Sequence, residues 1–280
     1  MNNQEIAKQT LKIIEQEKYR TPEGHTIDLS EDISYCLAHT VCYGPDQLST
    51  IQRRISKRKI SRVRKTDLKV RNETTLQGSR RLAREEHYEK IGVLNFASAR
   101  NPGGGFMKGA QAQEESLARS SALYPSLRQC PEYYEYHRSH RSTLYSDRMI
   151  WSPGCPVLRT DDGTLLNKPY KVDFITSPAP NAGAVRQNEP ENVSKIESVL
   201  RERSAKLLAL AAHHDCEALI LGAWGCGVFK NDPEVVARIF RDHLGQTGAF
   251  HNTFHKVLFS VLDTTDAQKI ITPFRAAFNS

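Results

Sequence analysis

Two adjacent glutamates, Glu114 and Glu115, stand shortly after three consecutive glycines at 103–105 and directly after Gln113. A carboxyl group can serve as a general acid or base if its pKa is raised toward neutrality. On a helix, neighbouring side chains point about 100° apart, so the two carboxyl groups would act from one side of a bond in different roles. Most glycosidases instead place two carboxylates on opposite sides of the bond. The alternative is the ordinary acidic bias of a helix N-terminus.

A helix N-terminus stabilises carboxylate anions, so a raised pKa at this place needs a separate cause. Three causes are available here: the like-charged neighbour, burial under a ligand, and phosphates held by nearby glycine loops. The chemistry of the glutamates therefore depends on what the glycines bind.

Glycine loops follow two apolar runs, which we expect to be buried strands. Gly103-Gly104-Gly105 follows residues 91–98, and Gly225-Cys226-Gly227 follows residues 218–223. Glycine admits positive φ and close approach of a ligand to the backbone, and successive N–H groups can bind an anion. We expect a helix just after each loop to add partial positive charge. Neither loop fits the P-loop or the dinucleotide fingerprint. The alternative is two tight strand–helix turns.

The elements around these loops alternate between strands and helices. Helical patterns cover residues 3–19, 72–87, 115–127 and 191–215, with the third expected to end before Pro125. This order predicts an α/β sandwich with a largely parallel or mixed sheet. In such sheets ligands bind beyond the carboxyl ends of the strands, where both glycine loops are expected.

The chain has 280 residues, 39% of them hydrophobic, a net charge of +7 and a pI of about 9.1. Much of this charge lies in residues 53–71, which are either a solvated face or a contact for a polyanion. The six cysteines match no zinc module, and adjacent side chains such as His213 and His214 rarely share one metal ion. Reduced thiols and an N-terminus without a signal peptide predict a cytoplasmic protein.

Taken together, the glycines, seven further residues and Gln113-Glu114-Glu115 resemble the GGG-x(6–8)-QEE signature of poly(ADP-ribose) glycohydrolases. The flanking stretches "VLNFASARNPGGGF" and "QAQEESLARSSALYPSL" are similar to the microbial type of this family. Similarity extends to "IAKQTLKIIEQ", "NETTL", "SPAPNAG" and "LILGAWGCGVFKNDPEVVA", and so covers nearly the whole chain.

The resemblance implies a macrodomain-like, three-layer α/β/α sandwich with a mixed sheet over residues 61–280, preceded by an N-terminal helical extension over residues 1–60. The implied reaction is hydrolysis of the ribose–ribose O-glycosidic bond of poly(ADP-ribose), with release of ADP-ribose. Glu115 would be the catalytic acid/base, and Glu114 would hold the departing ribose. The implied substrate-binding residues are Asn101 for the distal ribose, Gly103, Gly104, Gly105, Gln113, Gly225, Cys226, Gly227 and Val228 around the diphosphate, and Phe229 on the nucleotide side.

The resemblance also implies exo action, a monomer, and no metal or cofactor. Phe229 could equally be a core residue, since spacing alone does not distinguish the two. Two other functions stay open from the sequence. One is a macrodomain that binds ADP-ribose without cleaving it, and the other is a mono-ADP-ribosyl hydrolase.

Overall fold

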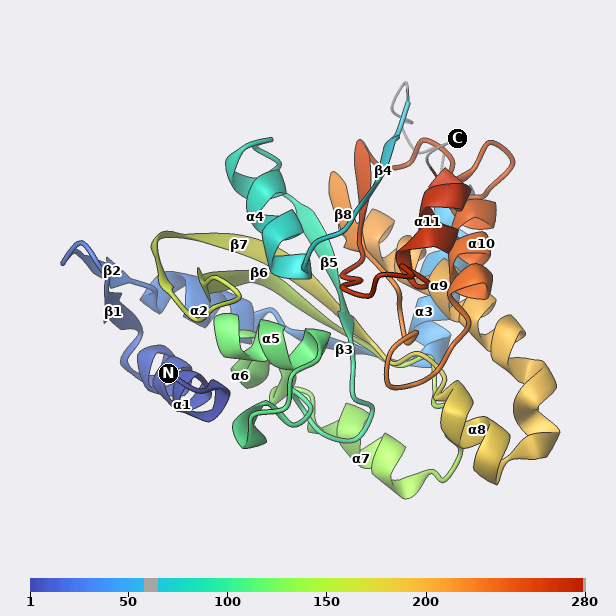
Figure 1. Ribbon diagram of the computed structural model, residues 1–280, viewed down its shortest axis with the longest axis horizontal. Helices are drawn as coiled ribbons and strands as arrows, with labels where there is room; N and C mark the ends of the chain where they lie inside the picture. The colour runs from blue at the N-terminus through green and yellow to red at the C-terminus, as the bar shows by residue number, and fades with distance from the viewer. Residues whose placement is uncertain (58–64, 279–280) are drawn as a thin grey trace.

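The computed structural model describes residues 1–57 and 65–278 (Figure 1). Its centre is a seven-stranded mixed sheet in the order β3-β6-β7-β5-β8-β9-β4, and a two-stranded hairpin, β1-β2, lies apart from it. Strands β7, β5, β8, β9 and β4 pair in parallel, whereas β6 is antiparallel to both β7 and β3. The described strands are β1 (Lys18–Arg20), β2 (Thr26–Asp28), β3 (Val41–Tyr43), β4 (Asp67–Arg71), β5 (Ile91–Phe96), β6 (Met149–Arg159), β7 (Leu165–Ser177), β8 (Ala218–Leu221) and β9 (Lys256–Ser260).

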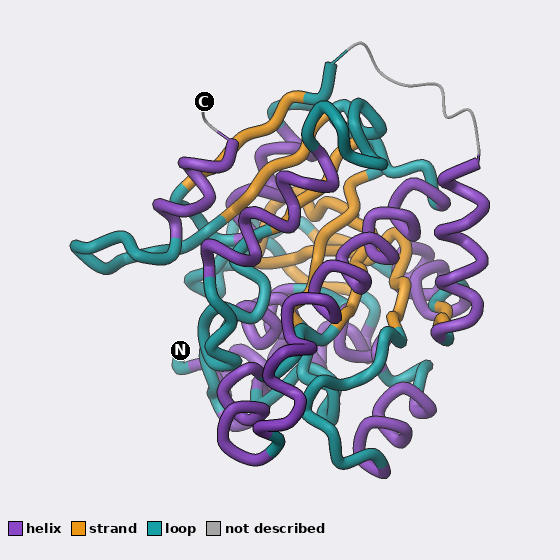
Figure 2. The backbone as a smooth tube through the Cα atoms, turned by 90° about the vertical axis from the view of Figure 1, so that its right-hand side faces the viewer, coloured by secondary structure: helices purple, strands orange, loops and turns teal. Residues whose placement is uncertain are grey.

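Helices cover both faces of the sheet, and in Figure 2 the strands lie inside a shell of helices. The described α-helices are α1 (Asn3–Gln16), α2 (Ser30–Ala38), α3 (Pro45–Lys57), α4 (Thr75–Arg84), α5 (Gln113–Ser120), α6 (Leu123–Leu127), α7 (Pro131–Ser139), α8 (Ala182–Asn188), α9 (Ile196–His213), α10 (Pro233–Leu244) and α11 (Ile271–Phe278). Two short 3-10 helices, η1 (Phe106–Lys108) and η2 (Pro190–Lys195), complete the set.

Alternation along the strands produces two cores. Leu94 of β5 faces one core with α3, α8, α9, α10 and α11, whereas its neighbour Val93 faces another with α1, α2, α4, α5, α6 and α7. Side chains of successive strand residues point to opposite faces, so each buried strand must be apolar throughout. The predicted three-layer α/β/α sandwich with a mixed sheet is confirmed.

The region before the expected domain boundary contributes to this sandwich. Strand β3 pairs with β6 at the edge of the main sheet, and Leu48, Ile51 and Ile55 of α3 lie in the core with α9. The expected boundary between residues 60 and 61 and part of the basic stretch 53–71 lie outside the described residues. The division into an extension and a catalytic domain stays a prediction.

One predicted helix was wrong. In the stretch 115–127, one helix was expected that ends before Pro125. The structure has two helices there, α5 and α6, with extended backbone at Ser121 between them. Ser121 forms an antiparallel bridge with Val157 of β6, and the Ala122 N–H donates to the carbonyl of Pro156 at 3.1 Å. These contacts with the sheet break the helix, and α6 then accommodates Pro125 in its first turn.

Among the described helices, none combines the length and the hydropathy that a bilayer span requires.

Candidate active site

Strand β5 ends at the centre of the sheet, and its last residues hold Glu114. The Asn95 side chain donates from Nδ2 to Oε1 of Glu114 at 3.2 Å, and the Ser98 N–H donates to Oε2 at 2.6 Å. Asn95 is fully buried and also donates to the Thr176 hydroxyl at 3.1 Å. Sequence reasoning missed Asn95, although a polar residue inside the apolar run 91–98 was a usable signal.

Glu114 is a buried carboxyl group, only 3% exposed. Burial raises its pKa to about 8, and the neighbouring Glu115 carboxylate adds to this rise against the hydrogen bonds from Ser98, Asn95 and the Gly103 N–H. A carboxyl group with such a pKa is mostly neutral at pH 7, so one proton is held at this position. Of the causes expected from the sequence, the like-charged neighbour acts on Glu114, whereas the burial is by the protein itself and the expected burial under a ligand stays a prediction.

Glu115 is half-buried and faces the first glycine loop. The Gly105 N–H donates to its Oε1 at 2.9 Å. A Cβ atom on residue 104 would overlap this oxygen and lie 3.4 Å from Oε2 of Glu114, so both carboxyl groups lie against Gly104. The backbone is in the left-handed region at Gly103 (φ 68°) and Gly104 (φ 59°), which glycine adopts without penalty.

Two amides of the first glycine loop already have acceptors within the protein. The N–H of Gly104 donates to the Asn101 carbonyl at 3.0 Å, and that of Gly105 donates to Glu115 at 2.9 Å. In this structure the loop therefore holds Glu115, and its expected contact with a diphosphate stays a prediction. The Asn101 side chain is exposed at the start of the loop.

Gln113 ties the start of α5 to β5. Its Nε2 donates to the Leu94 carbonyl at 2.7 Å and to the Thr75 hydroxyl at 3.1 Å, and its Oε1 accepts from the Phe96 N–H at 2.9 Å. Each polar atom of the amide has a protein partner. Gln113 lines the cleft, and these hydrogen bonds fix the first turn of α5, which carries Glu114 and Glu115, against β5.

The second glycine loop follows β8 and turns on Gly225, whose φ is 72°. The Asn231 side chain donates to the carbonyls of Gly225 (3.1 Å) and Pro180 (2.8 Å), which fixes the loop. Within the described part of the chain, no acceptor meets the N–H groups of residues 227–229. Nothing lies within 4 Å of the Cβ position of Gly227. This run of N–H donors is available to an anion.

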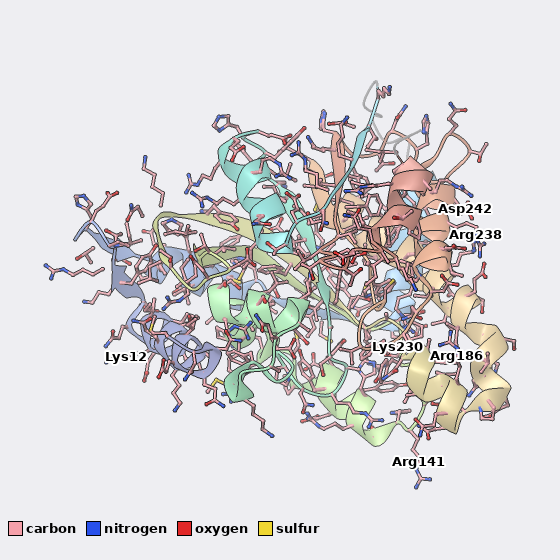
Figure 3. All side chains as sticks on the ribbon, viewed as in Figure 1. Lys12, Arg141, Arg186, Lys230, Arg238 and Asp242 are labelled. Carbon is pink, nitrogen blue, oxygen red and sulfur yellow. The ribbon has the colours of Figure 1, made fainter. Side chains whose placement is uncertain are left out.

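The side chains of the second loop have different environments. Cys226 is buried, and burial raises the pKa of its thiol well above the ordinary value. Val228 is 77% exposed, and Phe229 packs partly against the core with its ring 6.0 Å from that of Tyr145. Beside this loop, Arg186 donates to the Lys230 carbonyl at 3.2 Å, and both residues are labelled in Figure 3.

One expectation about the loops was wrong. Neither is followed directly by an α-helix: η1 follows the first, and the next α-helices begin only at Gln113 and Pro233. Asp232 caps the second of these helices by accepting from the Glu234 N–H at 2.9 Å. The loops therefore depend on their own N–H groups and on nearby side chains rather than on an adjoining helix dipole.

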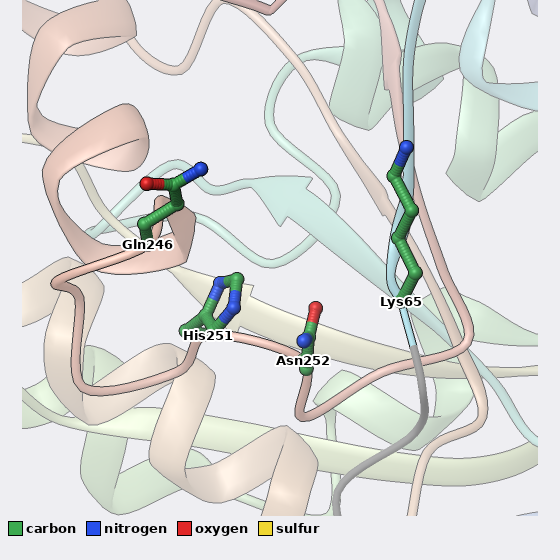
Figure 4. A pocket seen from close by; sticks show the side chains of 4 residues that line it. All are labelled: Lys65, Gln246, His251 and Asn252. Atoms are coloured by element: carbon green, nitrogen blue, oxygen red, sulfur yellow. The ribbon is translucent and has the colours of Figure 1, made fainter.

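A cleft of about 540 Å³ separates the signature helix from the second loop. Residues 111–113 and Ser116 lie on one side of it, and residues 223–225 and 227–229 on the other. Sequence reasoning missed a further part of its wall, which is formed by residues 73–76 at the start of α4 and by residues 260–262 after β9. A second hollow, of about 850 Å³, is lined by Lys65, Gln246, His251 and Asn252 and holds none of the signature residues (Figure 4).

Comparison with known proteins agrees with this geometry. The family model described as "Microbial-type PARG, catalytic domain" matches residues 7–160. The chain belongs to this family. The predicted resemblance is confirmed, and the signature and its two flanking stretches lie inside the matched region.

Solved structures of poly(ADP-ribose) glycohydrolases resemble this family member over most of its length. The enzyme from Thermomonospora curvata is 43% identical, with a TM-score of 0.94 and coverage of 99% of both chains. Its structure bound to the inhibitor ADP-HPD has a TM-score of 0.91 at the same identity and coverage. The enzyme from Deinococcus radiodurans in complex with ADP-ribose is 43% identical, with a TM-score of 0.82 over 88% of this chain and 96% of that one. A comparison with curated protein sequences returned no significant match.

Proposed function

We propose that the protein is a poly(ADP-ribose) glycohydrolase that hydrolyses the ribose–ribose O-glycosidic bond and releases ADP-ribose. One observation carries this proposal: the Glu115 carboxyl group is held by the Gly105 N–H at the carboxyl end of the central strand. Residues 227–229 line the cleft, and their N–H groups have no acceptor within the described residues, whereas Glu115 is not part of the cleft lining. A ligand with a diphosphate and an adjoining ribose would join these two places.

In the proposed reaction, Glu115 is the catalytic acid/base. It gives a proton to the 2′-oxygen of the departing ribose as the bond from that oxygen to the anomeric carbon breaks. Water attacks the anomeric carbon and returns a proton to Glu115. The diphosphate, gripped by the second loop, stabilises the positive charge that develops on the sugar.

Glu114 is proposed to hold the departing ribose. As a largely neutral acid it can donate a hydrogen bond to a sugar hydroxyl as well as accept one. Asn101, exposed at the start of the first loop, is proposed to orient the distal ribose, and Phe229 to pack against the nucleotide side. Gln113 and residues 103–105 support the site by the contacts that fix both glutamates.

The mode of attack, the assembly and the location are part of the same proposal. We expect removal of terminal ADP-ribose units by a monomer in the cytoplasm, which rests on the resemblance to the microbial type and on the reduced cysteines. Sizing of the products from labelled polymer tests the mode. Free ADP-ribose alone supports exo action, and short oligomers contradict it.

The decisive experiment compares Glu115→Ala with the wild type on labelled poly(ADP-ribose). We expect the variant to lose turnover while ADP-ribose binding, measured by calorimetry, persists. Glu135→Ala, which removes an exposed carboxylate on α7, is the control and should leave turnover intact. Full activity of Glu115→Ala would refute the role of Glu115. A wild type that binds but does not cleave would indicate a reader, and cleavage of mono-modified substrate alone a mono-ADP-ribosyl hydrolase.

A further inference from the structure

Three metal-ligating side chains meet away from the cleft. Cys42 lies on the edge strand β3, Cys130 caps the N-terminus of α7, and Glu132 lies in the first turn of that helix. Both elements are labelled in Figure 1. The two sulfur atoms and a carboxylate oxygen lie within 4.8 Å of one another. Spacing in the sequence did not reveal this group because its members come from distant segments.

The donor set suits a divalent ion that binds thiolates. Around Zn²⁺, with Zn–S distances of about 2.3 Å, tetrahedral ligand atoms lie about 3.7 Å apart. The three ligand atoms, which lie within 4.8 Å of one another, would therefore have to approach by up to about 1 Å when an ion binds. Two thiolates favour zinc-like ions over the harder Mg²⁺ and Ca²⁺, and a carboxylate completes three protein ligands. Water would supply the fourth.

The three side chains differ in their exposure to solvent, and this difference permits entry of an ion from one side. Cys130 is only 1% exposed, Cys42 is half-buried and Glu132 is exposed. An ion can therefore approach from the carboxylate side and reach sulfur atoms that are shielded from bulk water. Within residues 1–57 and 65–278, no ion pair or hydrogen bond occupies the Glu132 carboxylate.

We infer that Cys42, Cys130 and Glu132 form a binding site for a zinc-class divalent metal ion. The ion would join β3 to the start of α7. Strand β3 is short and pairs only with β6, so this link would fix the edge of the sheet. The site is separate from the cleft, and its occupancy is independent of the proposed glycosidase activity.

Co²⁺ titration of the reduced full-length chain tests this inference. We expect one equivalent to give the thiolate charge-transfer band and the visible bands of tetrahedral cobalt, and Zn²⁺ to abolish them. Cys42→Ser and Cys130→Ser should lose these bands, and Glu132→Gln should weaken binding at least about tenfold. Cys216→Ala removes a buried thiol elsewhere and should keep them.

A second readout separates binding from misfolding of the variants. Zn²⁺ should raise the Tm of the wild type and of Cys216→Ala but not that of Cys42→Ser, whose circular dichroism should match the wild type. The inference is overturned if the cobalt bands are absent from the reduced wild type or survive in Cys42→Ser. It is also overturned if thiol titration and mass spectrometry show that Cys42 and Cys130 remain joined in a disulfide in the presence of reductant, because no thiol is then free to bind a metal ion.

Discussion

Gly104 lies directly against the carboxyl group of Glu115. A Cβ atom on residue 104 would overlap Oε1 and lie 2.9 Å from Cδ of that glutamate. Glycine at this position therefore serves two needs, the positive φ of 59° and the room for the carboxyl group. Glu115 is held in place by the shape of the loop as well as by the Gly105 N–H.

Gly104→Ala should disable the proposed reaction. The methyl group would displace the Glu115 carboxyl group, and a misplacement of about 1 Å can lower a rate about 100-fold. The measurement is kcat on labelled polymer. Gly24→Ala is the matched control, because Gly24 has a φ of 89° with nothing within 4 Å of its Cβ position. Both variants should lose roughly 1 kcal/mol of stability to the left-handed backbone, but only Gly104→Ala should lose turnover. Equal kcat in the two variants would contradict this explanation.

Gln113→Leu should loosen the start of α5. The substitution leaves the Phe96 N–H, the Leu94 carbonyl and the Thr75 hydroxyl without their partner, which costs about 1–3 kcal/mol of folding free energy for each group that stays unsatisfied. Because the glutamates follow directly, we expect kcat to fall more than KM rises. Chemical denaturation and steady-state kinetics measure both effects.

Gln111→Leu gives the control for this prediction. Gln111 lines the same cleft but is exposed, and no hydrogen bond of its side chain occurs within the described residues. Its replacement should leave stability and kcat near the wild-type values. If Gln113→Leu behaves in the same way, the amide of Gln113 does not position the signature.

The sequence predicted the parts of the site that depend on local pattern. Apolar runs marked β5 and β8, and the glycines that follow them marked the loops, because buried parallel strands and positive φ both restrict residue type. The sequence did not reveal which groups the loop amides would bind. The amides of Gly104 and Gly105 bond the protein itself, whereas no acceptor among the described residues meets those at 227–229. That distinction depends on tertiary packing around Asn95 and Asn231.

Tertiary contacts also explain the parts of the fold that the sequence did not predict. Strand β3 has three residues, too few for an alternating pattern, and it exists because β6 pairs with it. Helix α1, which the sequence placed in the N-terminal helical extension, contacts the rest of the fold: the Thr10 hydroxyl donates to the carbonyl of Arg119 at the end of α5 at 2.7 Å. Ala7 of α1 packs with Phe106 and Ala118 beneath the first glycine loop. None of these contacts has a local sequence signal.

Gly227→Ala should weaken ADP-ribose binding without harm to the fold. A methyl group at this position meets no protein atom within 4 Å, and it would project where a diphosphate must approach the loop amides. We expect Kd for ADP-ribose to rise about tenfold, which corresponds to about 1.4 kcal/mol. The Tm should stay at the wild-type value. Val228→Ala keeps its N–H group and shortens an exposed side chain, so it should bind more tightly than Gly227→Ala. The reverse order would place the diphosphate elsewhere.

The raised pKa of Glu114 predicts a specific pH dependence of stability. Burial raises this pKa in the folded protein to about 8, from the ordinary value of 4.5. Between these values the unfolded chain has released the proton that the folded protein keeps. The contribution of Glu114 to stability is therefore complete below about pH 4.5 and is lost as the pH rises toward 8, at about 1.4 kcal/mol per pH unit. Glu114→Gln cannot ionise and should lack this decline. We therefore expect the free energy of unfolding, measured by chemical denaturation from pH 5 to 8, to fall with rising pH in the wild type more steeply than in Glu114→Gln.

Glu135→Gln, at an exposed position, is the control, and its stability should change with pH as that of the wild type does. Parallel curves for wild type and Glu114→Gln would show that the buried carboxyl group is ionised across this range and cannot donate a hydrogen bond to the departing ribose.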